Sequence, residues 1–447
     1  MSCFVILPNQ LFEDITVLRG YKEIFLLEEP HYFASDIKPN KIKIAYMRAC
    51  MLCYYDYLKA NHINVIYKSF AEIIKTNYLF LAKFTKRFLY EITDFKLSYK
   101  YKSLKLAITE IETPMFLMKQ ADLIAYDRKK TPTHASFYIM TKEKLGILKD
   151  VKNQDVYNRK NPKTIIAVNN EINYISSKTI NYYKAGIAYA NENFKDHIGT
   201  ATLETIKIYP ITFIDAYKAF DYFLHNNFKH FGNFQDVIQD TNPFMYHAII
   251  SPMLNNGLLN PKRLLIILES YKNKIDISAY EGFVRQIIGW REYTRYLYLY
   301  KYESLIASNN HKNYKKLDKS WYSATTGITI IDNEIKKAIA YGYAHHIIRL
   351  MVFLNFLILS EINPNDIYKW FMEVVSIDAY DWVMIPNIYS MGGFSSIGMK
   401  RPYLSSSNYI LKMSNYKKDG KWDLLWTDKF RSFVKSRKLN FYLRSIK

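Results

Sequence analysis

The chain has 447 residues, which is long enough for two or three domains, and 49% of them are hydrophobic, so a large core can be buried. Lys and Arg outnumber Asp and Glu by 62 to 41, giving a formal net charge of +21. This excess favours a polyanionic partner such as a nucleic-acid backbone, although the codon bias of an AT-rich genome is an alternative source of the lysines. The three cysteines exclude a disulfide framework.

The first 130 residues are expected to form a parallel α/β domain. Apolar segments at 3–7, 23–27 and 63–67 have the composition of buried strands, and a helical pattern covers 42–59. This alternation favours a parallel sheet covered by helices. Cys50 and Cys53 lie three residues apart in the helical pattern, where packed thiols are a better interpretation than half of a metal site.

Residues 131–205 are polar and poorly periodic, so we interpret them as a connector over the surface. From residue 206 to the end the pattern is helical. Asn260-Pro261 and Asn363-Pro364 each place Asn at an N-cap and Pro at the first helical position. Ser278, three residues before Glu281, predicts a capping box. The division is therefore 1–130, 131–205 and 206–447.

No segment predicts a membrane span or a signal peptide. The first residues carry no basic flank, and the longest apolar run, 350–359, is half as long as a membrane span. We therefore expect a soluble, intracellular monomer without membrane contact. All six tryptophans lie between 290 and 426, and composition fits core packing as well as a stacking or electron-transfer site.

Six motifs in the helical half carry a family resemblance. In chain order they are 231–236 (FGNFQD), 246–259 (YHAIISPMLNNGLL), 281–293 (EGFVRQIIGWREY), 343–351 (YAHHIIRLM), 378–387 (DAYDWVMIPN) and 401–410 (RPYLSSSNYI). Together they resemble the cryptochrome/photolyase family, most closely its bacterial (6-4) photolyase branch. Weaker matches at 5–11 (VILPNQL) and 155–160 (DVYNRK) extend the resemblance over nearly the whole chain.

The resemblance implies a photolyase fold, in which a Rossmann-like α/β antenna-type domain precedes an all-α domain that binds FAD and DNA. Residues of the motifs that would bind the FAD are His247, Ser251, Asn255, Gln286, Arg291, Arg349, Asp378 and Met384. Arg349 and Asp378 match the family pair that flanks the isoalloxazine ring, where an Arg favours the anionic reduced flavin. Without the motif, an ordinary buried ion pair is the alternative interpretation.

The implied function is light-driven repair of pyrimidine (6-4) photoproducts in UV-damaged DNA by electron transfer from reduced FAD. The resemblance makes His346 the catalytic proton donor, with His345 beside it and Tyr403 and Tyr409 near the lesion. Trp290 would stack on a base of the lesion. The aromatic residues of the implied electron-transfer route to the flavin are Trp370, Tyr380 and either Trp321 or Tyr322.

The chain also departs from the family pattern. No cysteine follows Cys53, so we expect no iron–sulfur cluster, since thiolates are needed to hold one. Met384 stands where the family tends to have an acid, and Asn9 replaces the Asp that helps to hold an antenna pigment. A lumazine-type antenna therefore remains open, with Glu28 and Glu29 as candidate contacts.

Three alternatives to (6-4) repair remain open from the sequence. They are a cryptochrome-type blue-light photoreceptor without repair activity, a cyclobutane-dimer photolyase, and a flavin-free DNA-binding relative. The paired histidines favour (6-4) repair over cyclobutane-dimer repair, and the Arg349–Asp378 pair argues against the flavin-free relative.

Overall fold

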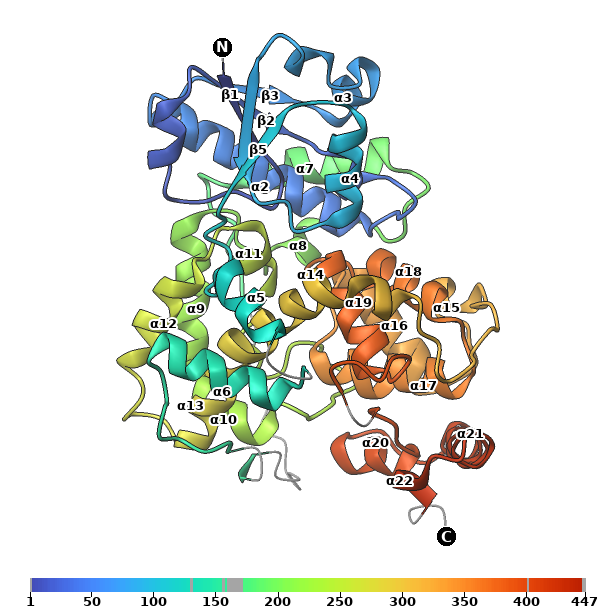
Figure 1. Ribbon diagram of the computed structural model, residues 1–447. Coiled ribbons are helices and arrows are strands. Elements are labelled where there is room, and N and C mark those ends of the chain that lie inside the picture. Colours follow the sequence, from blue (N-terminus) through green and yellow to red (C-terminus); the bar gives the residue numbers. More distant parts are fainter. Residues whose placement is uncertain (1, 129–131, 155–156, 159–171, 400–401, 444–447) are drawn as a thin grey trace.

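A five-stranded parallel sheet forms the N-terminal part of the protein (Figure 1). The computed structural model describes residues 2–128, 132–154, 157–158, 172–399 and 402–443. The strands are β1 (Ser2–Ile6), β2 (Glu23–Leu27), β3 (Val65–Lys68), β4 (Lys86–Tyr90) and β5 (Ile108–Ile111), in the order β3-β2-β1-β4-β5. β1 is central, and its Val5 pairs with Phe25 of β2 and Leu89 of β4. β1 and its neighbour β2 are apolar because helices cover a parallel sheet.

The predicted α/β class is confirmed, and the three segments predicted as strands are β1, β2 and β3 within two residues at each end. β4 and β5 were not predicted. The helices of this part are α1 (Pro30–Phe33), α2 (Lys41–Ala60), α3 (Phe70–Thr76) and α4 (Phe95–Ser103), with two 3-10 turns at Thr16–Gly20 and Leu79–Leu81. α2 is the helix predicted at 42–59.

Part of the predicted connector packs against the α/β part. Helix α7 (Ile180–Asn193) lies along α2, and Gly186 makes this close approach possible. A Cβ at Gly186 would lie 2.3 Å from the carbonyl oxygen of Ala45 and 3.2 Å from the amide nitrogen of Ala49. The other half of the connector contributes α6 (His134–Leu145), which packs against the helical part instead.

The rest of the chain is largely helical, as predicted. Its helices are α5 (Gln120–Asp127), α8 (Leu203–Ile206), α9 (Phe213–Asn226), α10 (Phe228–Phe234), α11 (Ser251–Asn256), α12 (Pro261–Glu269), α13 (Ile277–Val284), α14 (Glu292–Ile306), α15 (Ser320–Ser323), α16 (Thr329–Tyr341), α17 (Asn355–Leu359), α18 (Pro364–Val374), α19 (Asp381–Ile385), α20 (Ser407–Met413), α21 (Trp422–Ser436) and α22 (Asn440–Leu443). Among the described helices, none combines the length and apolarity needed to cross a membrane.

Local signals explain several of these helix starts. Asn260 caps α12 by accepting from the amides of residues 262 and 263, and Asn363 caps α18. The predicted capping box at Ser278 is wrong. Asp276 is the N-cap of α13, and its carboxylate accepts from both the amide and the hydroxyl of Ser278. The helix is therefore capped at Asp276, two residues before the predicted cap at Ser278.

Buried polar contacts join the sheet part to the helical part. Glu91 follows β4, and both of its carboxylate oxygens accept from Nη2 of Arg295 in α14 at 2.9 Å. The ammonium group of Lys43 in α2 donates to the carbonyl of Ala379 at 2.5 Å. The domain boundaries drawn from the sequence remain a proposed division, since the connector contributes helices to both parts.

Candidate functional site

A cavity of about 550 Å³ opens in the helical part of the protein. This volume falls in the usual range of small-molecule sites. Its wall combines polar side chains with a large apolar surface, and it is built from segments that are far apart in the sequence, between Phe231 and Met413.

Three π-helical segments among the described residues contribute to the cavity wall. They are η4 (Arg285–Arg291), η5 (Ile348–Leu354) and η6 (Pro386–Met391). Gln286 of η4, Arg349 of η5 and Asn387 of η6 all line the cavity. π-helical turns are rare and are frequently found at functional sites, because the extra residue per turn changes the direction of the side chains. Their convergence on one cavity marks it as the main candidate site.

An ion pair forms one part of the wall. Arg349 Nη2 lies 2.7 Å from Asp378 Oδ1, and the two side chains are 15% and 9% exposed. Ser251, the first residue of α11, donates from its hydroxyl to Asp378 Oδ2 at 2.5 Å. Arg349 also donates from Nε to the carbonyl of Ala344 at 2.5 Å. The guanidinium group is therefore held in one orientation, with its charge at the cavity.

Asn255 and Arg291 support this wall from behind. The side-chain amide of Asn255 donates to the backbone carbonyl of Asp378 at 3.0 Å. Arg291 donates from Nη2 to Asn255 Oδ1 at 3.4 Å and from Nη1 to the carbonyl of Met115 at 2.8 Å. Burial lowers the pKa of Arg291 to about 10. Of the residues predicted to bind a cofactor, these two hold the wall, whereas His247, Ser251, Gln286, Arg349, Asp378 and Met384 line it.

The two adjacent histidines lie in different environments. His346 is exposed and lines the cavity, whereas His345 is 2% exposed and lies behind the wall. The ring of His345 stacks on that of His247, with centroids 4.5 Å apart and planes at 17°. Burial lowers the pKa of His247 to about 4 and that of His345 well below its usual range. Both stacked rings are therefore neutral near pH 7.

A turn at Gly342 directs the histidine segment into the wall. Gly342 ends α16 in the left-handed region at φ 62°, and its carbonyl accepts from the amide of Ile377 at 2.9 Å. A Cβ at this position would lie 2.6 Å from Ile42 Cγ2. Glycine is required here by both the backbone conformation and the close approach of α2.

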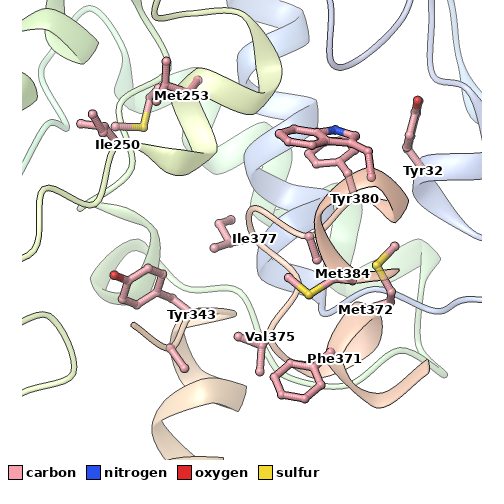
Figure 2. Close-up of a cluster of buried hydrophobic side chains, with 14 of the residues drawn as sticks. Tyr32, Ile250, Met253, Tyr343, Phe371, Met372, Val375, Ile377, Tyr380 and Met384 are labelled. Atoms are coloured by element: carbon pink, nitrogen blue, oxygen red, sulfur yellow. The ribbon is translucent and has the colours of Figure 1, made fainter. Parts of the chain in front are cut away.

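Figure 2 shows a cluster of buried hydrophobic side chains, some of which line the cavity. The cluster includes Ile250, Met253, Tyr343, Phe371 and Met384. Ile250, Tyr343, Phe371 and Met384 line the cavity itself. Apolar ring surface and the Arg349–Asp378 ion pair thus line the same cavity.

Two of the predicted electron-transfer residues are in contact. The rings of Trp321 and Trp370 are 5.4 Å apart at 90°, and the indole N–H of Trp370 donates to the carbonyl of Trp321 at 2.8 Å. Phe371 lies 5.1 Å from Trp370 and lines the cavity, so the pair reaches the site through one ring. Tyr380 instead packs 5.6 Å from the ring of Tyr32.

The remaining predicted residues, Trp290, Tyr403 and Tyr409, all line the cavity. The ring of Trp290 stacks on that of His134 in α6, with centroids 3.7 Å apart and planes at 13°. One face of the indole is therefore covered by the connector segment.

Sequence reasoning gave no role to several other residues that line the cavity, namely Gln235, Asp236, Phe371, Asn387 and Lys412. Gln235, Asp236 and Asn387 belong to the recognised motifs, so their place in the site could have been predicted from the resemblance. Phe371 and Lys412 carried no such signal.

Comparison with known proteins agrees with this architecture. A family model described as "Deoxyribodipyrimidine photo-lyase-related protein" matches residues 4–205. Over 212 residues the chain is 35% identical to a (6-4) photolyase of Agrobacterium fabrum. The match covers 46% of this chain but only 42% of that protein.

Two crystal structures share the fold over nearly the whole chain. One is a bacterial class III photolyase from Agrobacterium tumefaciens, with a TM-score of 0.59 and 16% identity over 98% of this chain and 88% of that one. The other is a cryptochrome from Synechocystis, with a TM-score of 0.61 and 11% identity over 97% of this chain and 89% of that one. The chain therefore has the fold of photolyases and cryptochromes.

The cavity combines polar groups and apolar surface of the kind that a flavin dinucleotide needs. Ser251, Gln286 and the Arg349–Asp378 pair are polar groups for phosphate, ribitol or ring atoms, and the apolar side suits an isoalloxazine or adenine ring. The residues present therefore fit FAD.

Residues 413–426, which follow the last recognised motif and contain no cysteine, are held by hydrogen bonds and ordinary packing. The hydroxyl of Tyr416 donates to Glu334 at 2.9 Å, and the amide of Ile238 donates to the carbonyl of Met413 at 2.9 Å. Trp422 and Trp426 are 3% and 0% exposed. The motif at 155–160 lies largely outside the described residues, although Asn158 is described and donates to the carbonyl of Ser278.

The candidate antenna contacts are occupied by protein groups. Glu28 and Glu29 are both 0% exposed. Glu29 accepts from the hydroxyls of Tyr78 and Tyr101 and from Lys100 at 2.7–3.0 Å. Glu28 accepts from Arg48, Tyr67 and Tyr189 in the same way. A pigment would have to displace these donors to use either carboxylate.

Proposed function

We propose that this protein is a light-driven, FAD-dependent lyase that repairs pyrimidine (6-4) photoproducts in UV-damaged DNA. The observation that carries the proposal is the position of His346. Its exposed side chain lies on the wall of the same cavity as the Arg349–Asp378 pair. A proton donor and a cofactor anchor therefore meet in one site.

FAD would be held by the residues that line the polar part of the cavity, namely His247, Ser251, Gln286, Arg349 and Asp378, with Met384 on the apolar side. When bound and reduced, FAD supplies the photo-excited electron for repair. Arg349 keeps a positive charge beside the ligand because Asp378 and the carbonyl of Ala344 fix it. Asn255 and Arg291 maintain the wall from behind.

His346 is proposed to give a proton to the lesion while oxygen moves back between the two bases. An imidazole titrates near neutrality, so it can hold this proton at physiological pH and release it in the reaction. The stacked rings of His345 and His247 stay neutral, so they add no competing positive charge. Tyr403 and Tyr409 provide hydroxyl groups on the same wall.

Binding of damaged DNA is supported by charge and by stacking surfaces. The net charge of +21 would attract the phosphate backbone. The lesion must leave the base stack to reach the cavity, which costs least where pairing is already broken. Trp290 would stack on an extruded base with the face that His134 does not cover. Trp321 and Trp370, and in the sequence-based proposal Tyr380, would return an electron to the oxidised cofactor.

The decisive experiment compares the wild-type protein with His346→Ala on a synthetic oligonucleotide that carries one (6-4) photoproduct. Repair after illumination is followed by chromatography, and flavin content by absorbance. We expect a loss of about 100-fold or more, in line with loss of a positioned general acid, with flavin content unchanged. His225→Ala, at an exposed histidine of α9, is the matched control. Undiminished repair by His346→Ala would remove the assigned role.

A cryptochrome-type photoreceptor is the second candidate. It is favoured by Met384, which puts an apolar side chain where the family tends to have an acid, while the Trp321–Trp370 contact is retained. A flavin that is photoreduced without repair of either (6-4) or cyclobutane substrates would support this candidate. Repair of the cyclobutane substrate alone would instead identify a cyclobutane-dimer photolyase, and a protein that cannot be loaded with FAD would point to DNA binding without flavin.

A further inference from the structure

Three potential metal ligands meet where the sheet part joins the helical part. They are His31 of α1, Asp94 at the N-cap of α4, and Asp381 at the start of α19. One ligand atom from each lies within 4.8 Å of the other two. His31 Nε2 and Asp94 Oδ2 are 2.8 Å apart. None of the three residues lines the cavity of the candidate site.

The two carboxylates are buried, and one of them is incompletely satisfied. Asp381 is 1% exposed and Asp94 is 3% exposed. Asp94 Oδ1 accepts from the amides of Lys96 and Leu97, and Asp381 Oδ1 accepts from the hydroxyl of Tyr368. Asp381 Oδ2 has no hydrogen-bond partner among the residues that the structure describes. A buried carboxylate oxygen without a donor is costly and calls for a specific explanation.

The nearby lysines make other contacts. The ammonium group of Lys43 donates to the carbonyl of Ala379 and lies 4.4 Å from the centre of the Tyr380 ring. That of Lys96 lies 5.4 Å from the centre of the Tyr368 ring. Two acidic groups and one imidazole thus share a buried space whose direct counter-charge is incomplete.

We propose that His31, Asp94 and Asp381 form a binding site for a divalent transition-metal ion, and that Zn²⁺ fits it best. The set offers one imidazole nitrogen and two carboxylate oxygens, which are ligand types that Zn²⁺ accepts, whereas Mg²⁺ and Ca²⁺ prefer oxygen alone. The side chain of His31 is 15% exposed, so the cluster is not sealed from solvent, and a water would serve as the fourth ligand.

The distances are compatible with small side-chain movements. Ligands about 2.1 Å from a tetrahedral Zn²⁺ are roughly 3.4 Å apart. His31 Nε2 and Asp94 Oδ2, now at 2.8 Å, would move apart by about half an ångström, and the third ligand would approach. His31 would exchange its hydrogen bond to Asp94 for the metal bond. Tyr368 and the N-terminal amides of α4 would orient the two carboxylates from behind.

The bound ion would tie the two parts of the chain together. His31 and Asp94 belong to the sheet part, whereas Asp381 lies three residues before Met384 in the cavity wall. The proposal does not depend on flavin or on repair, because the cluster and its unsatisfied oxygen are independent of the cavity.

The test uses the full-length protein, stripped with chelator, exposed to Zn²⁺ and passed through gel filtration. Elemental analysis should find one equivalent of zinc per chain, and Co²⁺ in its place should give visible ligand-field bands. Asp381→Asn keeps an acceptor for Tyr368 but removes the charged ligand, and His31→Gln removes the imidazole. Each should lower zinc affinity by about 100-fold or more, since even outer-shell changes cost 10–100-fold.

His225→Ala is the matched control, because His225 and Asp221 form an exposed pair at 3.2 Å on α9. It should bind zinc like the wild type. Circular dichroism identifies any variant that fails to fold, and the two ligand variants provide independent readings. The proposal is refuted if the wild type retains no zinc, if folded Asp381→Asn and His31→Gln retain a full equivalent, or if only His225→Ala loses it.

Discussion

The Arg349–Asp378 pair allows a quantitative test of how the cavity wall is held. Asp378→Asn keeps the size of the side chain and an oxygen that can accept from Ser251, but removes the charge opposite Arg349. The two groups lie 2.7 Å apart with side chains 15% and 9% exposed, so the guanidinium group would stay in a largely dry environment without its counter-charge.

Removing one partner of a buried ion pair typically costs 3–5 kcal/mol, whereas exposed pairs contribute 0–1 kcal/mol. The partial exposure of Arg349 lets water recover part of the loss, so we expect the free energy of unfolding to fall by about 3 kcal/mol. Urea unfolding followed by tryptophan fluorescence measures this directly, because all six tryptophans lie in the helical part of the chain.

A double-mutant cycle with Arg349→Met separates the pair from other effects of each change. If the two groups form one buried unit, the double variant should lose much less stability than the sum of the single variants, with a coupling of about 2 kcal/mol. A coupling below about 0.5 kcal/mol would show that the charges act independently, and would refute the idea that Asp378 fixes the guanidinium group.

Three further predictions concern the elements around this pair. Burial lowers the pKa of His247 to about 4. Between about pH 6.5 and 4 the unfolded chain therefore binds a proton at this residue that the folded chain does not. The contribution of His247 to the unfolding free energy is fully present above this window and is lost as the pH falls through it. His247→Gln should remove about 2 kcal/mol of the loss between pH 7 and 5, measured as unfolding free energy at both pH values, and an unchanged loss would contradict the assignment. Trp370→Phe should slow photoreduction of bound flavin about tenfold or more in transient absorption, because it breaks the contact with Trp321; unchanged kinetics would exclude this route. Gly342→Ala should lower the unfolding free energy by about 2 kcal/mol, through the left-handed backbone and the 2.6 Å approach to Ile42, and an unchanged denaturation midpoint would refute that steric argument.

The sequence predicted the elements whose signals are local and strong. β1 and β2 are apolar along nearly their whole length, and the Asn-Pro pairs before α12 and α18 fix a cap and a first helical residue together. β4 begins with two basic residues, and β5 is an edge strand without a fully buried position. Their strand character comes from pairing with β1 and with each other, which a local pattern does not reveal.

Competition between neighbouring polar residues explains the error at α13. Both Asp276 and Ser278 are good N-cap residues, and the sequence alone offered Ser278 with Glu281 as a capping box. In the folded chain Asp276 accepts from both donors of Ser278, so the hydroxyl is no longer available as a cap. A carboxylate next to a hydroxyl is the stronger acceptor for the first amides of a helix.

The motifs indicated which residues lie at the candidate site, but not which of them line the cavity and which support its wall. Asn255 and Ser251 lie one turn apart on α11, yet Ser251 lines the cavity and Asn255 holds the wall from behind. His345 and His346 are adjacent, yet one is buried and the other exposed. These differences depend on which segment packs behind each residue. The π-helical turns add to this, because they change the facing of side chains relative to a regular helix.

One short segment, residues 378–388, connects the separate features of the molecule. Asp378 fixes Arg349, the ring of Tyr380 packs on Tyr32 of the sheet part, and Asp381 joins the cluster with residues of α1 and α4. Met384 and residues 387–388 then line the cavity. Since the segment is buried along most of its length and interiors are close-packed, we expect a displacement at the interface to be transmitted to the cavity wall. The sheet part therefore has a structural role for the site even if its own candidate pigment contacts, Glu28 and Glu29, remain occupied by protein donors.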